Sequence, residues 1–262
     1  MYARSLIVVA HPGEETLGCA RLLLREPQLC RILHVADGPV RDSRALRRAG
    51  AGMSPEALSA LRSREVRLAL GHFGLQPQQI ASLGLAERDV LPNIELAMDA
   101  ILSLIRAERP LELHTHPFEG GHPDADAVCF AVHKTLDILR REGEVCPQLF
   151  EFTSYHARDG LFRAAEFLSP YPSPQITLLS EAECGKKKEA LRFIHSQYNL
   201  IARFSLCEER WRRAEAYDFG ERPHQGPLYY EISRSGFTWE DFARFVNEIR
   251  DKQPDTPQSD KS

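Results

Sequence analysis

The segment at residues 5–18, SLIVVAHPGEETLG, joins an apolar run to a turn that carries ionisable side chains. The run SLIVVA at 5–10 is short and rich in β-branched residues, which is typical of a strand buried on both faces of a parallel sheet. The tripeptide His-Pro-Gly at 11–13 interrupts the run, and a helix is predicted from about residue 15 to residue 25. A buried strand that leads directly into a helix is the first half of a βαβ unit, so this segment predicts an α/β fold.

The alternation of strands and helices continues along the chain. Further strands are predicted at 31–36, 80–83, 111–115 and 149–154, with helices at 54–74, 93–107 and 123–141 and a long basic loop at 40–53. After residue 155 the alternation weakens, and we predict strands at 176–179 and 227–232 and helices at 181–200, 208–216 and 239–250. The pattern predicts a Rossmann-like, mainly parallel sheet with helices on both faces. We expect one domain over residues 1–252 and a disordered tail over 253–262, because the tail is polar and contains proline.

The composition limits the class of protein. The chain has 262 residues, of which 43% are hydrophobic and 27% charged, and its formal net charge is −4. These values predict a globular protein without the basic surface that nucleic-acid binding needs. We find no secretory leader and no run of the roughly 18 apolar residues that a membrane helix requires. The six cysteines show no C-x-x-C spacing, so we expect reduced thiols and a cytoplasmic protein.

The turn after the first strand places two ionisable side chains three residues apart. His11 and Glu14 are expected at the carboxyl end of the strand, where they offer an imidazole and a carboxylate to a divalent metal ion. The alternative is a plain strand–helix junction, in which Glu14 and Glu15 stabilise the helix dipole. This segment leaves both interpretations open, because two ligands do not make a site.

A second loop of the same kind lies between the strand at 111–115 and the helix at 123–141. The segment HTHPFEGGHPDADA at 114–127 contains three histidines and three carboxylates around a Gly-Gly turn. Asp124 follows His122 by two residues, and a carboxylate in that place orients an imidazole ring. Two loops rich in histidine and carboxylate, both at predicted strand ends, favour a common site.

Together the two segments resemble the motifs of the PIG-L/LmbE family of zinc-dependent N-deacetylases, which remove acetyl groups from N-acetylated amino sugars. AHPGEE at 10–15 is similar to the family's A-H-P-D-D-E, and GHPDAD at 121–126 is similar to its G-H-P-D-H. The resemblance extends to the DGP turn at 37–39, to Arg62 and Glu65, and to YDFGERPHQGPLYYE at 217–231. It implies the PIG-L/LmbE-like deacetylase fold and hydrolysis of an N-acetyl group on an amino-sugar-type substrate.

The sequence departs from the family pattern at positions that the family uses for metal binding and for the general base. The resemblance implies that His11 and Glu14 take metal-ligand positions, with Glu14 a longer carboxylate in place of aspartate. Gly13 stands where the family has its general base, and Ala125 stands where it has the third zinc ligand. Loss of a general base costs about 10²–10⁴-fold in rate. We therefore expect a weak or vacant metal site, at which zinc binds weakly or not at all.

The resemblance also nominates residues that this sequence retains. His122 and Asp124 are the candidate catalytic residues, because His122 resembles the histidine that stabilises the oxyanion in the family. Asp37 and Arg62 are candidate substrate-binding residues on the same ground, although a solvated helix arginine explains Arg62 equally well. His224 is a further substrate-binding candidate from its place in the loop before PLYYE, the alternative being an exposed loop histidine.

Two functions stay open at this point. One is a catalytically silent family member, a pseudoenzyme that keeps a pocket for a sugar-like small molecule. The other is an active metal-dependent amide hydrolase with rearranged ligands, for which His116, Glu119 or Asp126 would replace the missing one. Helical geometry argues against Asp126, since adjacent helical positions point about 100° apart. We expect neither a nucleic-acid partner nor a membrane span, and the sequence leaves homo-oligomer formation open.

Overall fold

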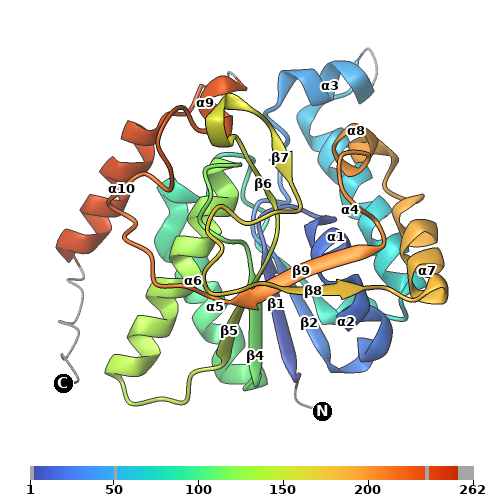
Figure 1. Cartoon of the computed structure of the whole chain (residues 1–262), viewed down its shortest axis with the longest axis horizontal. Helices are drawn as coiled ribbons and strands as arrows, with labels where there is room; N and C mark the ends of the chain where they lie inside the picture. Colours follow the sequence, from blue (N-terminus) through green and yellow to red (C-terminus); the bar gives the residue numbers. More distant parts are fainter. Residues whose placement is uncertain (1–2, 50–51, 234–235, 253–262) are drawn as a thin grey trace.

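A seven-stranded mixed sheet forms the centre of the molecule (Figure 1). The computed structural model describes residues 3–49, 52–233 and 236–252. In sheet order the strands are β3 (Ile80–Ser82), β2 (Cys30–His34), β1 (Ser5–Val9), β4 (Glu112–Thr115), β5 (Gln148–Phe152), β9 (Glu208–Arg213) and β8 (Gln175–Leu178). The first five are parallel, β9 is antiparallel to β5, and β8 is antiparallel to β9. The predicted Rossmann-like, mainly parallel sheet is confirmed.

Strand β1 shows why both faces of the sheet need a helical layer. All five of its residues are buried, and alternate side chains of a strand point to opposite faces. Leu6 and Val8 belong to a core that includes residues of α5 (Ile94–Glu108), α6 (Pro123–Arg141) and α10 (Trp239–Lys252). On the opposite face, Ile7 and Val9 belong to a core that includes residues of α2 (Ala20–Arg25), α4 (Pro55–His72) and α7 (Glu181–Leu191).

Shorter elements connect these layers. They are the helices α1 (Glu14–Gly18), α3 (Ser43–Ala49), α8 (Tyr198–Ile201) and α9 (Tyr229–Ile232), and the small antiparallel pair β6 (Tyr155–His156) and β7 (Arg163–Ala164). Single 3₁₀ turns lie at Pro27–Leu29, Pro77–Gln79, Leu91–Asn93, Arg158–Gly160 and His195–Gln197. Among the described residues, no helix is both long and apolar enough to cross a lipid bilayer.

Two helices begin where their capping residues predict. Ser54 Oγ accepts a hydrogen bond from the backbone N–H of Ala57 at 3.1 Å, and Pro55 is the first residue of α4. At α6 the cap is His122, whose Nδ1 accepts from the backbone N–H of Asp124 at 3.2 Å. The bounds of α6 agree with the predicted helix at 123–141, and its first turn brings the second polar loop to the sheet edge.

The sequence-based prediction is wrong in five segments, the first of which is the predicted helix at 15–25, divided at Cys19 into α1 and α2. Residues 40–53, predicted as a loop, contain α3, and the predicted helix at 181–200 is interrupted between α7 and α8. The predicted helix at 208–216 forms β9, and the predicted strand at 227–232 contains α9. In α9, Glu231 Oε2 accepts from the backbone N–H of Leu228 at 2.7 Å, and this cap outweighs the β-propensity of the tyrosines. One domain over 1–252 stays a prediction, and the predicted tail at 253–262 lies outside the described residues.

Strand β9 escaped prediction because its buried side chains are charged. Its sequence, EERWRR, lacks apolar alternation. Glu209 lies 2.9 Å from Lys187 Nζ, and Arg212 Nε lies 3.1 Å from a carboxylate oxygen of Glu151. Each buried charge therefore has a partner from another segment, as burial of a charge requires.

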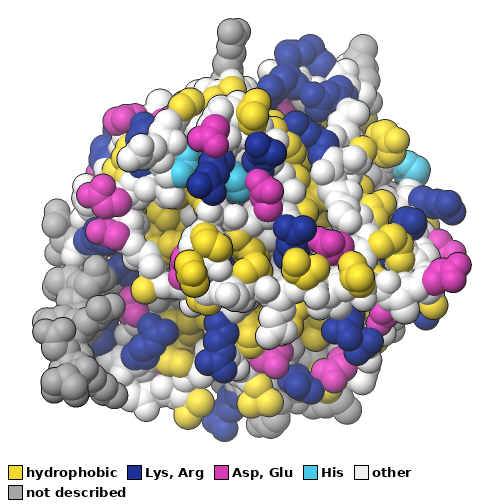
Figure 2. Space-filling view, viewed as in Figure 1, with side chains coloured by type: hydrophobic (Ala, Val, Ile, Leu, Met, Phe, Trp, Pro, Cys, Tyr) yellow, Lys and Arg dark blue, Asp and Glu magenta, His cyan; other side chains and the backbone are white. Residues whose placement is uncertain are grey.

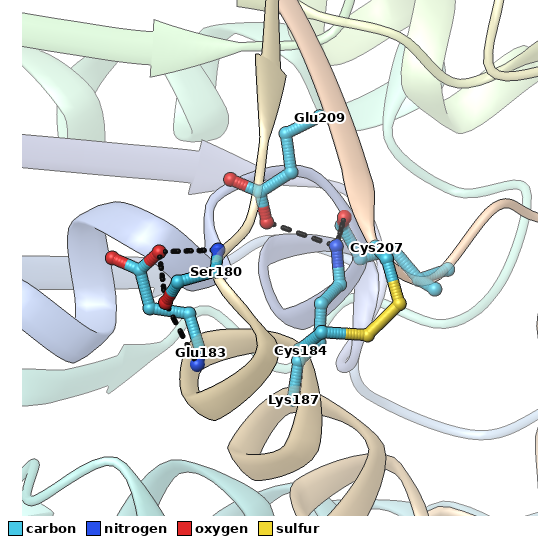
Figure 3. The surroundings of a disulfide bond; sticks show 7 residues. Ser180, Glu183, Cys184, Lys187, Cys207 and Glu209 are labelled. Carbon is cyan, nitrogen blue, oxygen red and sulfur yellow. Dashed lines mark hydrogen bonds and ion pairs between the residues drawn. A yellow bond between two sulfur atoms is a disulfide. The ribbon is translucent and has the colours of Figure 1, made fainter.

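A disulfide between Cys184 and Cys207 corrects the expectation that the thiols are reduced. Cys184 lies on α7 and Cys207 lies immediately before β9, so the bond joins this helix to the antiparallel edge of the sheet (Figure 3). Beside the disulfide, Lys187 is fully buried and donates to the carbonyl oxygen of Leu17 at 2.6 Å. The two cysteines are 23 residues apart, so no short spacing motif in the sequence predicts the disulfide.

Candidate active site

A cavity of about 260 Å³ lies at the edge of the sheet where β1 and β4 end. Ligands of parallel α/β sheets bind at this edge. His11 and Glu14 line the cavity from the loop after β1, and His122 lines it from the loop after β4. Its rim includes Arg44 and Arg48 of α3, the helix over which basic side chains gather in Figure 2. The two polar loops identified from the sequence therefore meet at one site.

His11 is held between two carboxylates. Its Nδ1 lies 3.2 Å from Glu14 Oε1 and its Nε2 lies 3.2 Å from Asp124 Oδ2. Burial disfavours the imidazolium, but the nearby carboxylates of Glu14 and Asp124 outweigh it and raise the pKa of His11 to about 10. In this arrangement each ring nitrogen of His11 lies within hydrogen-bond distance of a carboxylate oxygen.

Glu14 in turn joins His11 to a fully buried histidine behind it. His116 Nε2 lies 3.1 Å from Glu14 Oε2 and 3.0 Å from the backbone nitrogen of Ala10. Burial opposes ionisation of Glu14, yet its contacts with His116 and His11 hold its pKa well below the usual range. His116, one of the proposed substitute ligands, therefore contacts the site through Glu14 and does not line the cavity.

His122 presents its second nitrogen to a carboxylate that the sequence did not reveal. Because Nδ1 accepts from the backbone N–H of Asp124, the ring proton of the neutral imidazole lies on Nε2, which faces Glu87 Oε1 at 3.6 Å. Glu87 is buried and accepts from the backbone N–H groups of Arg41 and Asp42 at 2.7 and 2.8 Å. Although burial opposes ionisation, His122 and these donors hold the pKa of Glu87 well below its usual range. No motif surrounds Glu87, so only the three-dimensional structure identifies it.

Asp124 contacts His11 more closely than the ring it was expected to orient. Its Oδ2 lies 3.2 Å from His11 Nε2 but 3.7 Å from His122 Nδ1, and it accepts from the backbone N–H of Arg88 at 2.7 Å. The rings of His11 and His122 meet edge to face, with centroids 4.5 Å apart. Asp124 thus positions His11, while His122 is oriented by the backbone at the start of α6.

The three candidate substrate-binding residues have different surroundings. Arg62 lines the cavity, and its buried Nε has no hydrogen-bond partner among the described residues. Asp37 accepts hydrogen bonds from the backbone N–H of Gly84 at 2.9 Å and from the hydroxyl of Ser82, and it does not line the cavity. His224 also lies outside the lining, with Nδ1 2.8 Å from the carbonyl oxygen of Gln225.

Two of the positions that depart from the family pattern, Gly13 and Ala125, offer no replacement group. Gly13 has φ +104°, and a Cβ placed there would lie 3.4 Å from both Gln197 Nε2 and Ile194 Cδ1. Ala125 is buried in the hydrophobic core.

The remaining proposed substitutes are used elsewhere. Asp126 accepts from the backbone N–H groups of Glu119 and Gly120, and Glu119 accepts from the backbone N–H of Leu168 at 3.0 Å. Neither carboxylate lines the cavity.

The residues of the site fit zinc only in part. His11, His122 and Asp124 offer ligand atoms within 4.8 Å of one another, and two imidazoles with a carboxylate form a donor set that zinc accepts. However, both nitrogens of His11 face carboxylates, and Nδ1 of His122 already accepts from the backbone N–H of Asp124. The contacts of His11 with Glu14 and Asp124, and that of His122 Nδ1 with the backbone, would have to rearrange for both rings to ligate one ion.

The sheet topology and the two histidine–carboxylate loops agree with the PIG-L deacetylase fold. The sequence model of PIG-L, GlcNAc-PI de-N-acetylase, matches residues 6–136, which is 131 of 262 residues. The chain belongs to the PIG-L family. Among curated proteins, none matches this chain.

Solved structures that share the fold include three deacetylases. A pseudoaglycone deacetylase of an antimicrobial reagent is 19% identical, with 83% of this chain and 100% of that chain covered and a TM-score of 0.58. A deacetylase–teicoplanin complex from the teicoplanin biosynthesis pathway is 17% identical, with coverage of 82% and 100% and a TM-score of 0.61. The N,N'-diacetylchitobiose deacetylase of Pyrococcus horikoshii is 16% identical, with coverage of 74% and 71% and a TM-score of 0.52.

Proposed function

We propose that this PIG-L family protein binds an amino-sugar-type ligand in its cavity but does not hydrolyse the N-acetyl group. The observation that carries the proposal is Gly13, which takes the place that the family resemblance assigns to the general base. Its backbone has φ +104°, which glycine adopts freely and residues with a side chain adopt rarely. Without a positioned base, the rate falls by about 10²–10⁴-fold.

The incomplete metal site supports the same proposal. Zinc, when bound, supplies a water of lowered pKa and polarises the acyl oxygen of the substrate. Here both ring nitrogens of His11 face carboxylate oxygens of Glu14 and Asp124, and Ala125 gives no third ligand. We expect zinc to bind this site weakly.

The groups that would bind a ligand are still present. Arg62 and the His122–Glu87 pair line the cavity with both donors and acceptors, which sugar hydroxyls require. The volume of about 260 Å³ is close to the lower end of small-molecule sites, about 300 Å³, and suits a group of monosaccharide size.

A second function, an active metal-dependent amide hydrolase with rearranged ligands, is favoured by one observation. The ligand atoms of His11, His122 and Asp124 lie within 4.8 Å of one another. In such an enzyme, Asp124 would replace the ligand lost at Ala125, and Glu87 would be the nearest carboxylate able to take a proton from His122.

One NMR experiment separates binding from hydrolysis. Saturation-transfer spectra of N-acetylglucosamine with the protein report binding, while the acetyl methyl signal in the same sample reports release of acetate. We expect saturation transfer without acetate, and a loss of transfer in Arg62→Met. Arg64→Met, an exposed arginine on the same helix that does not line the cavity, is the matched control. Acetate that accumulates, or transfer that is absent from the unmodified protein, would overturn the proposal.

A further inference from the structure

A second group of metal-binding side chains lies outside the cavity. Cys129 and His133 of α6 and Glu151 of β5 offer a sulfur, an imidazole nitrogen and a carboxylate oxygen within 4.8 Å of one another. Cys129 and His133 are four residues apart on one helix, so their side chains share a face. None of the three residues lines the cavity described above.

Two buried atoms of this group have no partner among the described residues. They are Glu151 Oε1 and His133 Nε2. Glu151 is fully buried, and its other oxygen accepts from Arg212 Nε at 3.1 Å and from the hydroxyl of Tyr217 at 2.9 Å. A buried polar atom left without a partner costs about 1–3 kcal/mol. Two such atoms beside a buried thiol indicate that the group accommodates a ligand.

The surrounding charges favour a divalent cation. Arg212 lies between the carboxylates of Glu151 and Glu215, at 3.1 and 2.7 Å. When ionised, these three groups carry a net charge of −1. A divalent ion bound together with the thiolate of Cys129 adds +1, so the assembled cluster is neutral.

We propose that Cys129, His133 and Glu151 form a zinc site that is separate from the site at His11. Thiolate, imidazole and carboxylate are all zinc ligands, whereas magnesium and calcium select oxygen ligands alone. On binding, the Sγ–H bond of Cys129 breaks, its proton passes to solvent, and the sulfur forms a bond to the ion. A water completes four-coordination. Ligands at about 2.0–2.3 Å from one ion lie roughly 3.3–3.8 Å apart, so the side chains move together by about 1 Å.

Such a site has a structural consequence for the cavity. It ties the middle of α6 to β5, and the first turn of α6 carries His122 as its cap and Asp124 against His11. Zinc bound there would fix the position of this helix without taking part in the chemistry at its start.

Cobalt substitution tests the proposal directly. The metal-free protein, with the Cys184–Cys207 disulfide intact, is titrated with Co²⁺, because a cobalt–thiolate bond gives a charge-transfer absorption that cobalt bound to histidine and carboxylate alone lacks. We expect this absorption in the unmodified protein, displaced by one equivalent of Zn²⁺. It should be lost in Cys129→Ser and weakened at least 10-fold in apparent affinity in His133→Gln.

Two controls identify the site. Cys146→Ser removes another free, partly buried cysteine, and His11→Ala removes the candidate ligand of the cavity, so both should retain the absorption. If Cys129→Ser fails to fold, as judged by circular dichroism, the affinity for Co²⁺ of the His133→Gln variant, at a half-buried position, tests the proposed site. Absence of the absorption from the unmodified protein, or its persistence at full strength in the folded variants of Cys129 or His133, would overturn the proposal.

Discussion

Gln197 packs against the point at which a side chain on Gly13 would begin. A Cβ on Gly13 would lie 3.4 Å from Gln197 Nε2, and the same nitrogen donates to the carbonyl oxygen of Pro12 at 2.8 Å. The backbone of Gly13 has φ +104°, which residues with a side chain rarely adopt. The turn after β1 therefore has a backbone conformation that favours glycine at residue 13. The family resemblance implies a general base at this position.

Substitution of Gly13 by alanine should destabilise the protein. The left-handed conformation costs a residue with a Cβ about 1–2 kcal/mol. Gly71, within helix α4, has open space around it, so Gly71→Ala should gain about 0.5–1 kcal/mol. Urea unfolding of both variants measures the two effects. A Gly13→Ala protein as stable as the unmodified one would show that the turn does not require glycine.

The charge of Glu14 should control the protonation of His11. Burial alone would lower the pKa of His11, and Glu14 is the largest influence that raises it to about 10. In zinc-free Glu14→Gln protein we therefore expect the pKa of His11 to fall toward the ordinary value near 6.5. NMR titration of the imidazole resonances measures this shift. An unchanged His11 titration would show that the contact with Glu14 does not hold the imidazolium.

Acid should destabilise the fold through His156. This residue of β6 is fully buried, its Nδ1 accepts from the backbone N–H of Arg158 at 3.2 Å, and burial with the nearby charge of His224 lowers its pKa to about 4. The unfolded chain then binds more protons than the folded one between about pH 6.5 and pH 4. The free energy of unfolding should fall across this window by up to about 3 kcal/mol from His156 alone.

His156→Asn keeps an acceptor for Arg158 and removes the titrating group. Its stability should depend less on pH between 6.5 and 4 than that of the unmodified protein, as measured by thermal or urea unfolding. The exposed His195→Asn variant is the control and should preserve the original slope. Identical slopes for His156→Asn and the unmodified protein would contradict the assignment.

Reduction of the Cys184–Cys207 disulfide should weaken the antiparallel edge of the sheet. The bond closes a loop of 23 residues, which corresponds to about 3 kcal/mol in the chain-entropy description. We expect the double variant Cys184→Ala/Cys207→Ala to be less stable by about 2–4 kcal/mol and to be insensitive to added reductant. If reductant leaves the melting temperature of the unmodified protein unchanged, the pair does not form a stabilising bond.

The parts of the structure that could be predicted from the sequence are those with a local signal. Strand β1 and helix α6 follow from apolar periodicity and capping, and both polar loops follow from their position at strand ends. Strand β9 could not be predicted, because Lys187 and Glu151, which neutralise its buried charges, come from distant segments. Glu87 and the cysteine pair were missed for the same physical reason, since each acquires its role only from tertiary contacts.

Zinc-dependent release of acetate from N-acetylglucosamine tests most directly whether the cavity has lost the family reaction. The unmodified protein is assayed at high concentration with added Zn²⁺ beside a His11→Ala variant, which removes a candidate ligand without touching Gly13. We expect both proteins to release acetate at the same background rate. Turnover by the unmodified protein that requires zinc and disappears in His11→Ala would contradict the claim that the cavity is catalytically inactive. It would establish the active hydrolase instead.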